Sequence, residues 1–374
     1  MQPPTFSRLL GLDCLRALAI SLVLVSHITF LLFPDSTSTL IDGFRILGAI
    51  GVDLFFVLSG YLIGGILLKI INTDDLKWSA LFKFWKRRWL RTLPNYFLVL
   101  CLNIIVAFLV GILIPKELFQ YSLFIQNFSW GHPDFFTEAW SLSIEEYAYL
   151  LLPFLIFFLI ISFKNKNKPF LFLLSTVIVI MVLTGLKLSY NFNASVENYH
   201  DWSLSFRKVV IYRMDSIYYG FIAVFFMKKF PTYFEYNKNI FLIAGLVVFA
   251  VLHVIIYVFN LLPQSHLWFY VLVYLQMVAF SLMLLFPYFL HLRRTIFGKK
   301  IVEFISTRSY AIYLVNYSLV LLNIELLVNL KVLGPIEKTL IVLLFLFVTT
   351  VVSNVIYLYF ERPILKLRDR RFPR

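Results

Sequence analysis

Long apolar runs constrain the fold of this 374-residue chain more than any other feature. A helix needs about 20 consecutive apolar residues to cross a bilayer, and ten runs of about that length follow one another along the sequence. Because lipid cannot satisfy backbone hydrogen bonds, a spanning segment must form them within its own helix. The sequence therefore predicts an all-α, polytopic integral membrane protein with about ten transmembrane helices. The predicted spans cover residues 9–33, 46–70, 93–114, 143–162, 169–187, 210–227, 240–259, 267–290, 306–329 and 339–360.

The distribution of charge predicts how these helices are oriented. The chain has 34 Lys and Arg against 20 Asp and Glu, which gives a net charge of +14. With a cytoplasmic N-terminus, most of the cations fall in the inner loops and the C-terminal tail, as the positive-inside rule requires. This distribution favours membrane lipids as partners of the basic residues and argues against nucleic acid. We therefore expect both termini in the cytoplasm.

The segments between the spans predict one membrane domain, with a basic helix on its inner side and two long loops on its outer side. No linker rich in Pro, Gly or Ser divides the chain, so we expect a single transmembrane domain over residues 1–374 and no appended soluble domain. The basic and aromatic stretch 71–92 predicts an amphipathic helix on the inner membrane surface. The outer loops 115–142 and 188–209 are expected to form an extracytoplasmic mouth. Both cysteines lie in predicted spans, so they imply no disulfide framework, and we expect no metal site.

The first span combines two ionisable side chains on one face. Arg16 and His27 are eleven residues apart, which places them within about 20° of each other on a helix and roughly 16 Å apart along its axis. Ionisable groups in a membrane are costly and by default indicate a functional site. Asp13 precedes Arg16 by three residues, so a helix is expected to pair them. The alternatives are that Arg16 extends to the inner interface and that His27 only bonds to a neighbouring helix.

Two further spans carry carboxylates. In GAIGVDLFFVLSGYLIGG of the second span, Asp53 is expected toward the outer side and Ser59 near the middle of the membrane. An unpaired carboxylate is disfavoured there, so a functional or pairing role for Asp53 is favoured over a neutral one. Gly60 is expected to be a close-packing contact between helices. At the start of the sixth span, Arg213 and Asp215 are either interfacial anchors or members of a site.

Three arginines lie at the cytoplasmic end of the third span, in FWKRRWLRTLP. In one interpretation they anchor the helix at the anionic inner surface of the membrane. In the other, Arg88 and Arg91 form a fork for phosphate groups, with Arg87 beside them. The second interpretation predicts a phosphorylated ligand that arrives from the cytoplasm.

The segment EAWSLSIEEYAY opens the fourth predicted span from the outside. Ser143 and Glu146 fit a capping box, in which each side chain satisfies a backbone donor at the start of the helix. That interpretation leaves Glu145 without a role. Glu145 and His27 are both expected toward the outer leaflet, so the carboxylate could orient or acidify the imidazole, as a base and its orienting group do in nucleophilic sites.

Together these motifs resemble those of the acyltransferase family 3 of membrane O-acyltransferases, which modify bacterial surface polysaccharides and related envelope molecules. The resemblance covers nearly the whole chain and rests on six motifs in the family's order. They are LDCLRALAISLVLVSH, with Arg16 and His27; GVDLFFVLSGYLI, with Asp53 and Ser59; KRRWLRTLP; WSLSIEEYAY, with Trp140, Glu145 and Tyr149; YRMDSIYYG, with Arg213 and Asp215; and the terminal FERP. Many relatives carry a His where this chain has Asn316, so no role as a second histidine is assigned there.

The resemblance implies O-acyl transfer, in particular O-acetylation, at the bacterial inner membrane. Acyl-CoA, in particular acetyl-CoA, would be the cytoplasmic donor substrate, and no cofactor would be permanently bound. The acceptor would be a sugar hydroxyl of an envelope polysaccharide, lipopolysaccharide or glycolipid at the outer face. Many relatives append an extracytoplasmic esterase-like domain, for which we expect no counterpart here, so the membrane domain or a polysaccharide-assembly partner would complete the transfer.

Within this reaction, the residues take distinct expected roles. Alcohols are poor nucleophiles at neutral pH, and His27 has an intrinsic pKa suited to a general base. Glu145 would orient His27, and Arg16 would stabilise the thioester oxygen in the transition state or hold the donor. The three arginines of the third span would bind the nucleotide phosphates. The sequence is compatible both with direct transfer and with an acyl-enzyme intermediate.

Two other classes of function fit parts of the sequence. Ten spans with buried charges also suit a transporter or flippase for an envelope glycolipid, although the repeated halves of many transporters are not found. The third interpretation is a non-catalytic membrane partner in a polysaccharide-assembly complex.

Overall fold

The computed structural model describes residues 9–73, 76–163, 167–292 and 298–373. In these parts of the chain, ten helical segments are long and apolar enough to cross a membrane, and no strand occurs. The predicted all-α, multi-pass architecture with ten spans is therefore confirmed. Six spans are single helices: α1 (Leu10–Leu32), α2 (Thr39–Ile71), α3 (Trp78–Val110), α5 (Ala139–Phe163), α6 (Lys168–Asn193) and α11 (Lys238–Val258).

The other four spans are interrupted. Three of them contain a π-helical turn, a rare element that is frequent at functional sites. The sixth span consists of α8 (Val210–Arg213) and α9 (Asp215–Lys229); the eighth of α12 (Leu267–Phe269), η2 (Tyr270–Tyr274), α13 (Leu275–Met283) and α14 (Phe286–Leu290); the ninth of α15 (Lys299–Val315), η3 (Asn316–Leu321) and α16 (Leu322–Leu327); the tenth of α17 (Pro335–Ile356), η4 (Tyr357–Glu361) and α18 (Arg362–Arg371). Short elements join the spans: α4 (Leu118–Leu123), α7 (Tyr199–Trp202), η1 (Ser203–Arg207) and α10 (Pro231–Tyr236).

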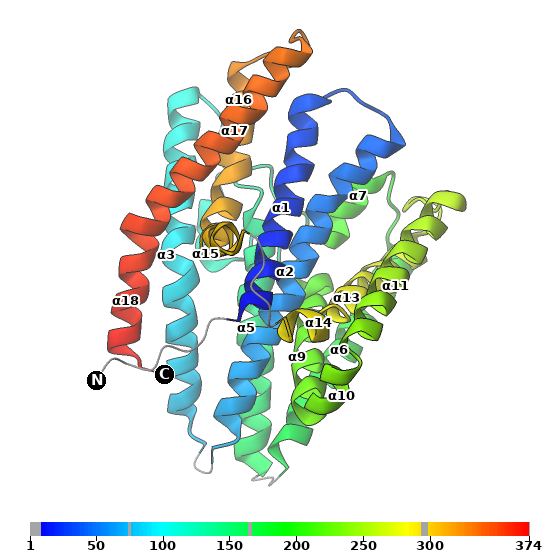
Figure 1. Ribbon diagram of the computed structural model, residues 1–374, viewed down its shortest axis with the longest axis vertical. Helices are drawn as coiled ribbons and strands as arrows, with labels where there is room; N and C mark the ends of the chain where they lie inside the picture. Colours follow the sequence, from blue (N-terminus) through cyan, green and yellow to red (C-terminus); the bar gives the residue numbers. More distant parts are fainter. Residues whose placement is uncertain (1–8, 74–75, 164–166, 293–297, 374) are drawn as a thin grey trace.

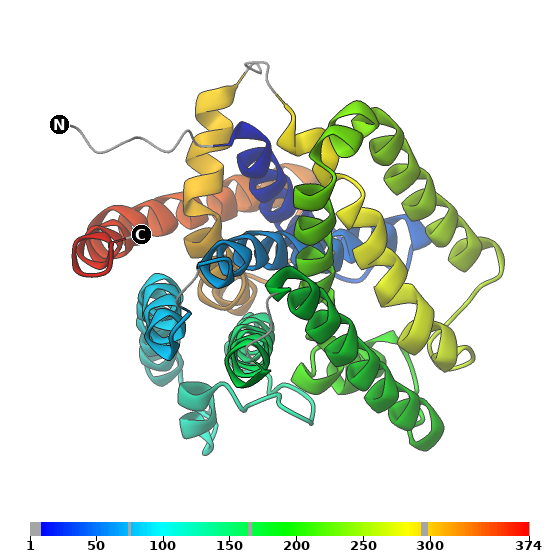
Figure 2. The ribbon, with the colours of Figure 1, turned by 90° about the horizontal axis from the view of Figure 1, so that it is seen from below.

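The helices pack around α1 and α2. Helix α2 packs against α1 and α9, and α1 also packs against α15. Seen from below, α2 lies inside a ring of the other spans (Figure 2). In Figure 1, α15 is viewed nearly end-on, whereas α16 runs upward beside α17, so the ninth span bends at η3. This bend brings η3 against α1.

Close packing of α2 against α9 depends on two glycines. A Cβ atom on Gly60 would lie 1.8 Å from the carbonyl oxygen of Ile217, and one on Gly220 would lie 2.2 Å from that of Val57. Only residues without a side chain allow two helix backbones to approach this closely. The expected close-packing role of Gly60 is confirmed.

The expected surface helix over 71–92 is wrong. The stretch from Trp78 onward is the first part of α3, which runs without interruption to Val110. Its apolar face is buried in protein because Leu81, Phe84 and Trp85 pack into the main hydrophobic cluster. The indole Nε1 of Trp85 also donates to the carbonyl oxygen of Tyr149 on α5, 3.0 Å away. The amphipathic pattern therefore marks a helix–helix interface at the end of a long span.

Candidate functional site

His27 lies on α1 with its imidazole against the π-helical turn η3. Its Nδ1 is hydrogen-bonded to Oδ1 of Asn316. The Nδ2 of Asn316 donates to the carbonyl oxygens of Ile312, 2.9 Å away, and Tyr313, 2.8 Å away. These two bonds fix the direction of the amide, so the oxygen that faces His27 is an acceptor and Nδ1 must be the donor. The lone pair of the neutral imidazole is therefore on Nε2.

The residue after Asn316 completes the surroundings of the imidazole. The ring of Tyr317 lies 4.9 Å from that of His27, centroid to centroid, at an angle of 44°. The backbone N–H of Ser318 donates to Oε1 of Glu138 at 2.7 Å. The turn that holds His27 is thus tied to the end of the loop that precedes α5.

A short polar track leads from η3 toward the centre of the protein. The hydroxyl of Tyr313 lies 2.7 Å from Oγ of Ser141 and donates to the carbonyl oxygen of Glu138 at 3.4 Å. All three residues are buried. Buried polar groups of this kind fix the geometry of a site because each one needs its partner.

The expected contact between Glu145 and His27 is not found. The carboxylate of Glu145 instead forms an ion pair with Arg88, with Nη2 and Oε2 2.8 Å apart. Tyr149 donates to the same oxygen at 2.8 Å, and Ser59 donates to Oε1 at 3.3 Å. Arg88 also lies over the ring of Tyr149, 4.2 Å from its centroid. The sequence motifs that contain these four residues therefore meet in one cluster, separate from the His27–Asn316 pair.

The expected capping box is also wrong. Helix α5 already begins at Ala139, so Ser143 lies in its second turn, where its hydroxyl accepts from Gln126 at 2.7 Å. Glu146 accepts instead from the hydroxyl of Thr92 on α3, 2.8 Å away. Because the helix begins one turn earlier than predicted, Ser143 and Glu146 do not cap it. They bond instead to residues of other segments.

Arg16 pairs with Asp13 as expected, with Nη1 and Oδ1 3.3 Å apart. The hydroxyl of Ser306 on α15 donates to the same carboxylate oxygen at 2.6 Å. Asp13 is buried and the side chain of Arg16 is 21% exposed. The start of α1 is therefore anchored to α15 by a paired carboxylate.

The three arginines of the third span do not form one site. Arg87 is paired with Asp369 on α18 at 2.8 Å, and Arg88 is paired with Glu145. Arg91 is exposed, and it has no hydrogen bond or ion pair within the described ranges. Its electrostatic neighbours are mostly cations: Arg16, Arg88 and Arg368, with Glu361 as the carboxylate. Arg91 is therefore the arginine of this group that is open to an anion.

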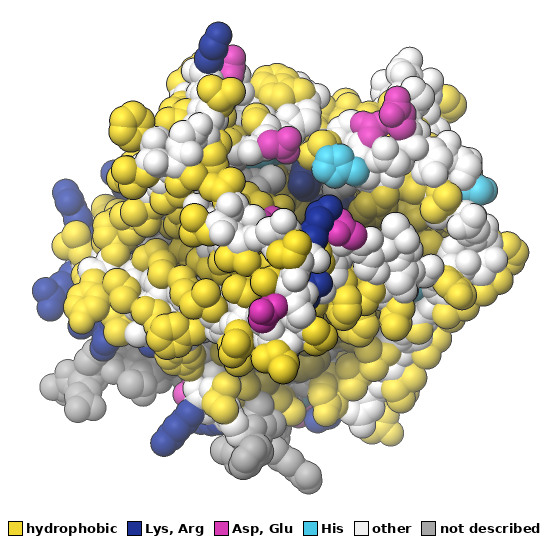
Figure 3. Space-filling view, turned by 90° about the horizontal axis from the view of Figure 1, so that it is seen from above, with side chains coloured by type: hydrophobic (Ala, Val, Ile, Leu, Met, Phe, Trp, Pro, Cys, Tyr) yellow, Lys and Arg dark blue, Asp and Glu magenta, His cyan; other side chains and the backbone are white. Residues whose placement is uncertain are grey.

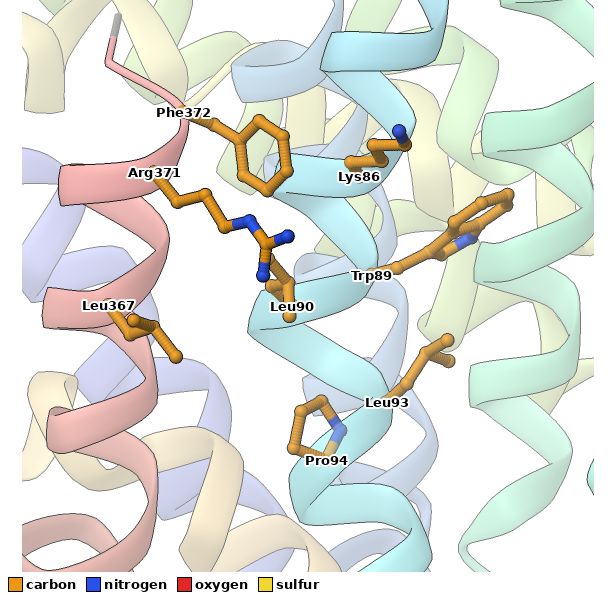
Figure 4. Close-up of a pocket in the computed structure, with 8 residues that line it drawn as sticks. All are labelled: Lys86, Trp89, Leu90, Leu93, Pro94, Leu367, Arg371 and Phe372. Carbon is orange, nitrogen blue, oxygen red and sulfur yellow. The ribbon is translucent and has the colours of Figure 1, made fainter.

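A pocket of about 430 Å³ lies between α3 and α18. In Figure 4, Arg371 reaches from α18 toward Leu90 of α3. Nζ of Lys86 lies 5.9 Å from the centroid of the Phe372 ring, so Lys86 faces the end of α18. Trp89 also lines the pocket. Leu93, Pro94, Leu367 and Phe372 complete its mainly apolar lining. None of the polar groups around His27 or Glu145 lines this pocket, so it is separate from the chemistry described above.

Asp53 is paired, as the sequence favoured. Its Oδ1 accepts from Nη2 of Arg213, whose Nη1 donates to Ser216. Lys187 on α6 forms a second ion pair, 2.5 Å long, with Asp215. Arg213 and Lys187 are fully buried. The break between α8 and α9 thus places a buried network where interfacial anchoring was the alternative, and the anchoring interpretation of Arg213 and Asp215 is wrong.

The loops that precede α5 and α8 carry further titratable groups. Burial raises the pKa of Glu138 to about 7, although the N–H of Ser318 opposes that shift. Burial and the neighbouring Arg207 lower the pKa of Lys208 to about 8, and burial lowers the pKa of His132 to about 3. Seen from above, basic, acidic and histidine side chains gather around hollows in an otherwise mainly apolar and neutral surface (Figure 3). Among the described residues, no group of three or more His, Cys, Asp or Glu side chains is placed to hold a metal ion.

Fold and site together define a multi-pass membrane protein with polar groups buried in its helix bundle. Residues 9–358 match the family model of the acyltransferase domain, and the chain belongs to that family. It is 26% identical to the O-acetyltransferase OatA of Staphylococcus aureus over an alignment of 387 residues, which covers 97% of this chain and 58% of OatA. A putative O-acetyltransferase of the same species is 30% identical over 172 residues, or 42% of this chain and 26% of that protein. No solved structure matches the chain.

Sequence reasoning missed several residues of these clusters. Asn316 was noted only as a departure from the family, yet it is the partner of His27. The sequence does carry a signal for Lys187, because a lysine within an apolar run is as costly as Arg16 or Arg213. Tyr313 and Glu138 gave no comparable signal, since their roles depend on the bend at η3.

Proposed function

We propose that this protein transfers an acyl group, in particular acetyl, from cytoplasmic acyl-CoA to a sugar hydroxyl of an envelope glycan or glycolipid at the outer face of the bacterial inner membrane. The family and the names of the relatives support O-acetyl transfer. The chain covers little more than half of OatA, so the complete reaction is part of the proposal. The charge distribution supports a cytoplasmic location for both termini.

The geometry of His27 is the observation that carries this proposal. A general base for an alcohol needs an unprotonated nitrogen, a fixed ring and a partner that stabilises the imidazolium. Asn316 holds Nδ1 in its protonated form through an amide whose direction is fixed by the carbonyls of Ile312 and Tyr313. Nε2 is then the nitrogen that receives the proton of the acceptor hydroxyl.

The reaction balances with this single base. As the hydroxyl oxygen attacks the thioester carbonyl carbon, its proton moves to Nε2 of His27. Collapse of the tetrahedral intermediate breaks the carbon–sulfur bond, and the proton on Nε2 passes to the departing thiolate. The products are the sugar ester and the free thiol of CoA. If His27 is acylated first, Nε2 displaces the thiolate and forms an acyl–nitrogen bond, so a labelled acyl group stays on the protein when no acceptor is present. The sugar oxygen then attacks the acyl carbon, the acyl–nitrogen bond breaks, and the hydroxyl proton passes to the released Nε2.

The donor is proposed to enter from the inner end of the bundle. Arg91 is accessible and unpaired within the described residues, and Arg16 and Arg368 lie in its electrostatic surroundings. An excess of guanidinium groups fits the phosphates of CoA. Arg88 and Glu145 hold one another, so their proposed role is to position α2, α3 and α5 around the acyl path.

Purified protein in lipid nanodiscs, incubated with labelled acetyl-CoA and a panel of envelope glycans, tests the proposal. We expect label in a base-labile ester on one class of glycan. His27→Ala should lose this transfer while its thermal unfolding stays close to that of the wild type. His253→Ala is the matched control, because His253 is a spanning-helix histidine bonded to the carbonyl of Phe249 on its own helix.

The outcomes separate the competing functions. Undiminished transfer by His27→Ala would refute the assignment of the base. Movement of unmodified glycolipid across the membrane without labelled product would support a flippase, and neither activity would support a non-catalytic partner. For the donor, Arg91→Gln should raise the KM for acetyl-CoA more than Arg87→Gln, since Arg87 is already paired with Asp369.

A further inference from the structure

The buried network around Asp53 contains more positive than negative charge. Arg213 and Lys187 are paired with Asp53 and Asp215, respectively. Arg207, at the end of η1, is a third cation that acts electrostatically on Asp53. Three cations thus share two carboxylates. A buried charge without a counter-charge is expensive, so this cluster is suited to receive an anion.

Two arginines of the network have a buried donor without a hydrogen-bond partner among the described residues, Arg213 at Nε and Arg207. Arg213 is already paired with Asp53, whereas Arg207 has no ion pair with a described carboxylate. Arg207 is 8% exposed, and its Nε donates to Oγ of Ser203 at 3.0 Å. Its guanidinium carbon lies 4.9 Å from the centroid of the Trp140 ring. The buried Nη1 has no hydrogen-bond partner within the described parts of the chain. Stacking on an aromatic ring with one edge unsatisfied is an arrangement that arginine uses to bind carboxylate and phosphate groups.

The position of Arg207 connects it to the proposed acceptor side. The next residue, Lys208, is held to the outer loop by its carbonyl, which accepts from Nδ2 of Asn127 at 2.6 Å. The same amide donates to the carbonyl of Trp140 at 3.1 Å. Arg207 also acts electrostatically on Tyr313, whose carbonyl fixes the amide of Asn316 beside His27. Arg207 therefore lies between the outer loops and the elements that orient His27.

We propose that Arg207, supported by Lys208, binds a carboxylate or phosphate group of the acceptor, so that the glycan acetylated by this protein is anionic. The inference rests on the proposed function and specifies its substrate class. In this arrangement the anion supplies the missing counter-charge and accepts from Nη1. The sugar that carries this anion would then present a hydroxyl to His27.

The first test is anion binding, which needs no catalysis. Thermal unfolding of the nanodisc protein is measured with glucuronate, glycerol phosphate or glucose at constant ionic strength. We expect glucuronate or glycerol phosphate to raise the Tm of the wild type and glucose to leave it unchanged; the more effective anion identifies carboxylate or phosphate as the group recognised. Arg207→Gln should lose the response, Arg207→Lys should keep part of it, and Arg308→Gln should respond as the wild type does. Equal responses of wild type and Arg207→Gln, or no response to either anion, would overturn the proposal.

The second test concerns the product. Mass analysis of glycans from cells with and without this protein is expected to find the added acetyl group on a sugar that bears a carboxylate or phosphate. An acetyl group confined to neutral sugars would overturn the inference and leave the acyltransferase proposal intact. Anion binding that depends on Arg207, without any acetylated product, would instead refute the acyltransferase proposal. With an active acceptor, Arg207→Gln should raise the acceptor KM about 10- to 100-fold, as for loss of a hydrogen bond to a charged group, with little change in the KM for acetyl-CoA.

Discussion

The replacement of Asn316 tests how His27 is held. Asn316→Ala removes the acceptor for Nδ1 and the two donors that fix it against the carbonyls of Ile312 and Tyr313. A hydrogen bond to a group that becomes charged in the reaction contributes about 1.5–3 kcal/mol. At about 1.4 kcal/mol for each tenfold change in rate, kcat should fall roughly 10- to 100-fold. The KM for acetyl-CoA should stay near its wild-type value, because the donor is proposed to bind at the other end of α1.

The assay is initial-rate acetyl transfer by nanodisc-reconstituted protein, with Asn316→Asp as the matched variant. Asp keeps an acceptor toward Nδ1, so it should preserve the tautomer and retain more activity than Ala. Asn323→Ala serves as control for loss of an amide in the same span, since its Nδ2 donates to the carbonyl oxygens of Ser318 and Leu319 in η3. Wild-type kcat in Asn316→Ala, or equal losses in the Ala and Asp variants, would refute the proposed orientation of the base.

Three further changes test the packing and electrostatics of the bundle. Asp53→Ala leaves Arg213 buried without its carboxylate and should lower the unfolding free energy by about 3–5 kcal/mol, against less than about 1 kcal/mol for the exposed Asp42→Ala; similar small losses for both would contradict the buried pair. Gly220→Ala places a Cβ 2.2 Å from a backbone oxygen, so its Tm should fall well below that of Gly185→Ala, which meets nothing within 4 Å, and equal Tm values would exclude this close crossing. Burial raises the pKa of Glu138 from 4.5 to about 7, so the contribution of its protonated form to stability is complete below about pH 4.5 and is lost as the pH rises through 7. Glu138→Gln should remove this pH dependence of the unfolding free energy, which amounts to up to about 3 kcal/mol. A pH profile of stability that is the same in Glu138→Gln and the wild type would contradict the raised pKa.

The spans were predictable because the bilayer imposes a length and a composition on each of them. Their ends and bends were less predictable. Helix α3 extends to Trp78 because its basic, aromatic end has a protein partner in α5, and hydropathy does not distinguish that partner from a membrane surface. The sequence of η3 contains no Pro or Gly that would predict the bend. It follows from packing between α1 and the ninth span, which sequence periodicity does not encode.

The sequence predicts which ionisable residues of the spans belong to the site, but it predicts fewer of their partners. Arg16 with Asp13 follows from helical spacing, and the need of Asp53 for a partner follows from the cost of burial. The partners of Glu145 and His27 depend on the relative rotation and depth of separate helices, which the sequence does not define. Their similar predicted depth suggested that Glu145 and His27 meet. In the structure, Glu145 pairs with Arg88 and His27 bonds to Asn316.

The most direct test of the central claim is transfer across a sealed membrane. Vesicles containing the protein with its proposed cytoplasmic face inside are loaded with labelled acetyl-CoA, and the glycan acceptor is added outside. We predict label on the outer glycan with the wild type and none with His27→Gln, although both variants insert equally. Transfer by His27→Gln at the wild-type rate, or transfer only when donor and acceptor share one side, would contradict a reaction that runs from an inner donor to a base at the outer side.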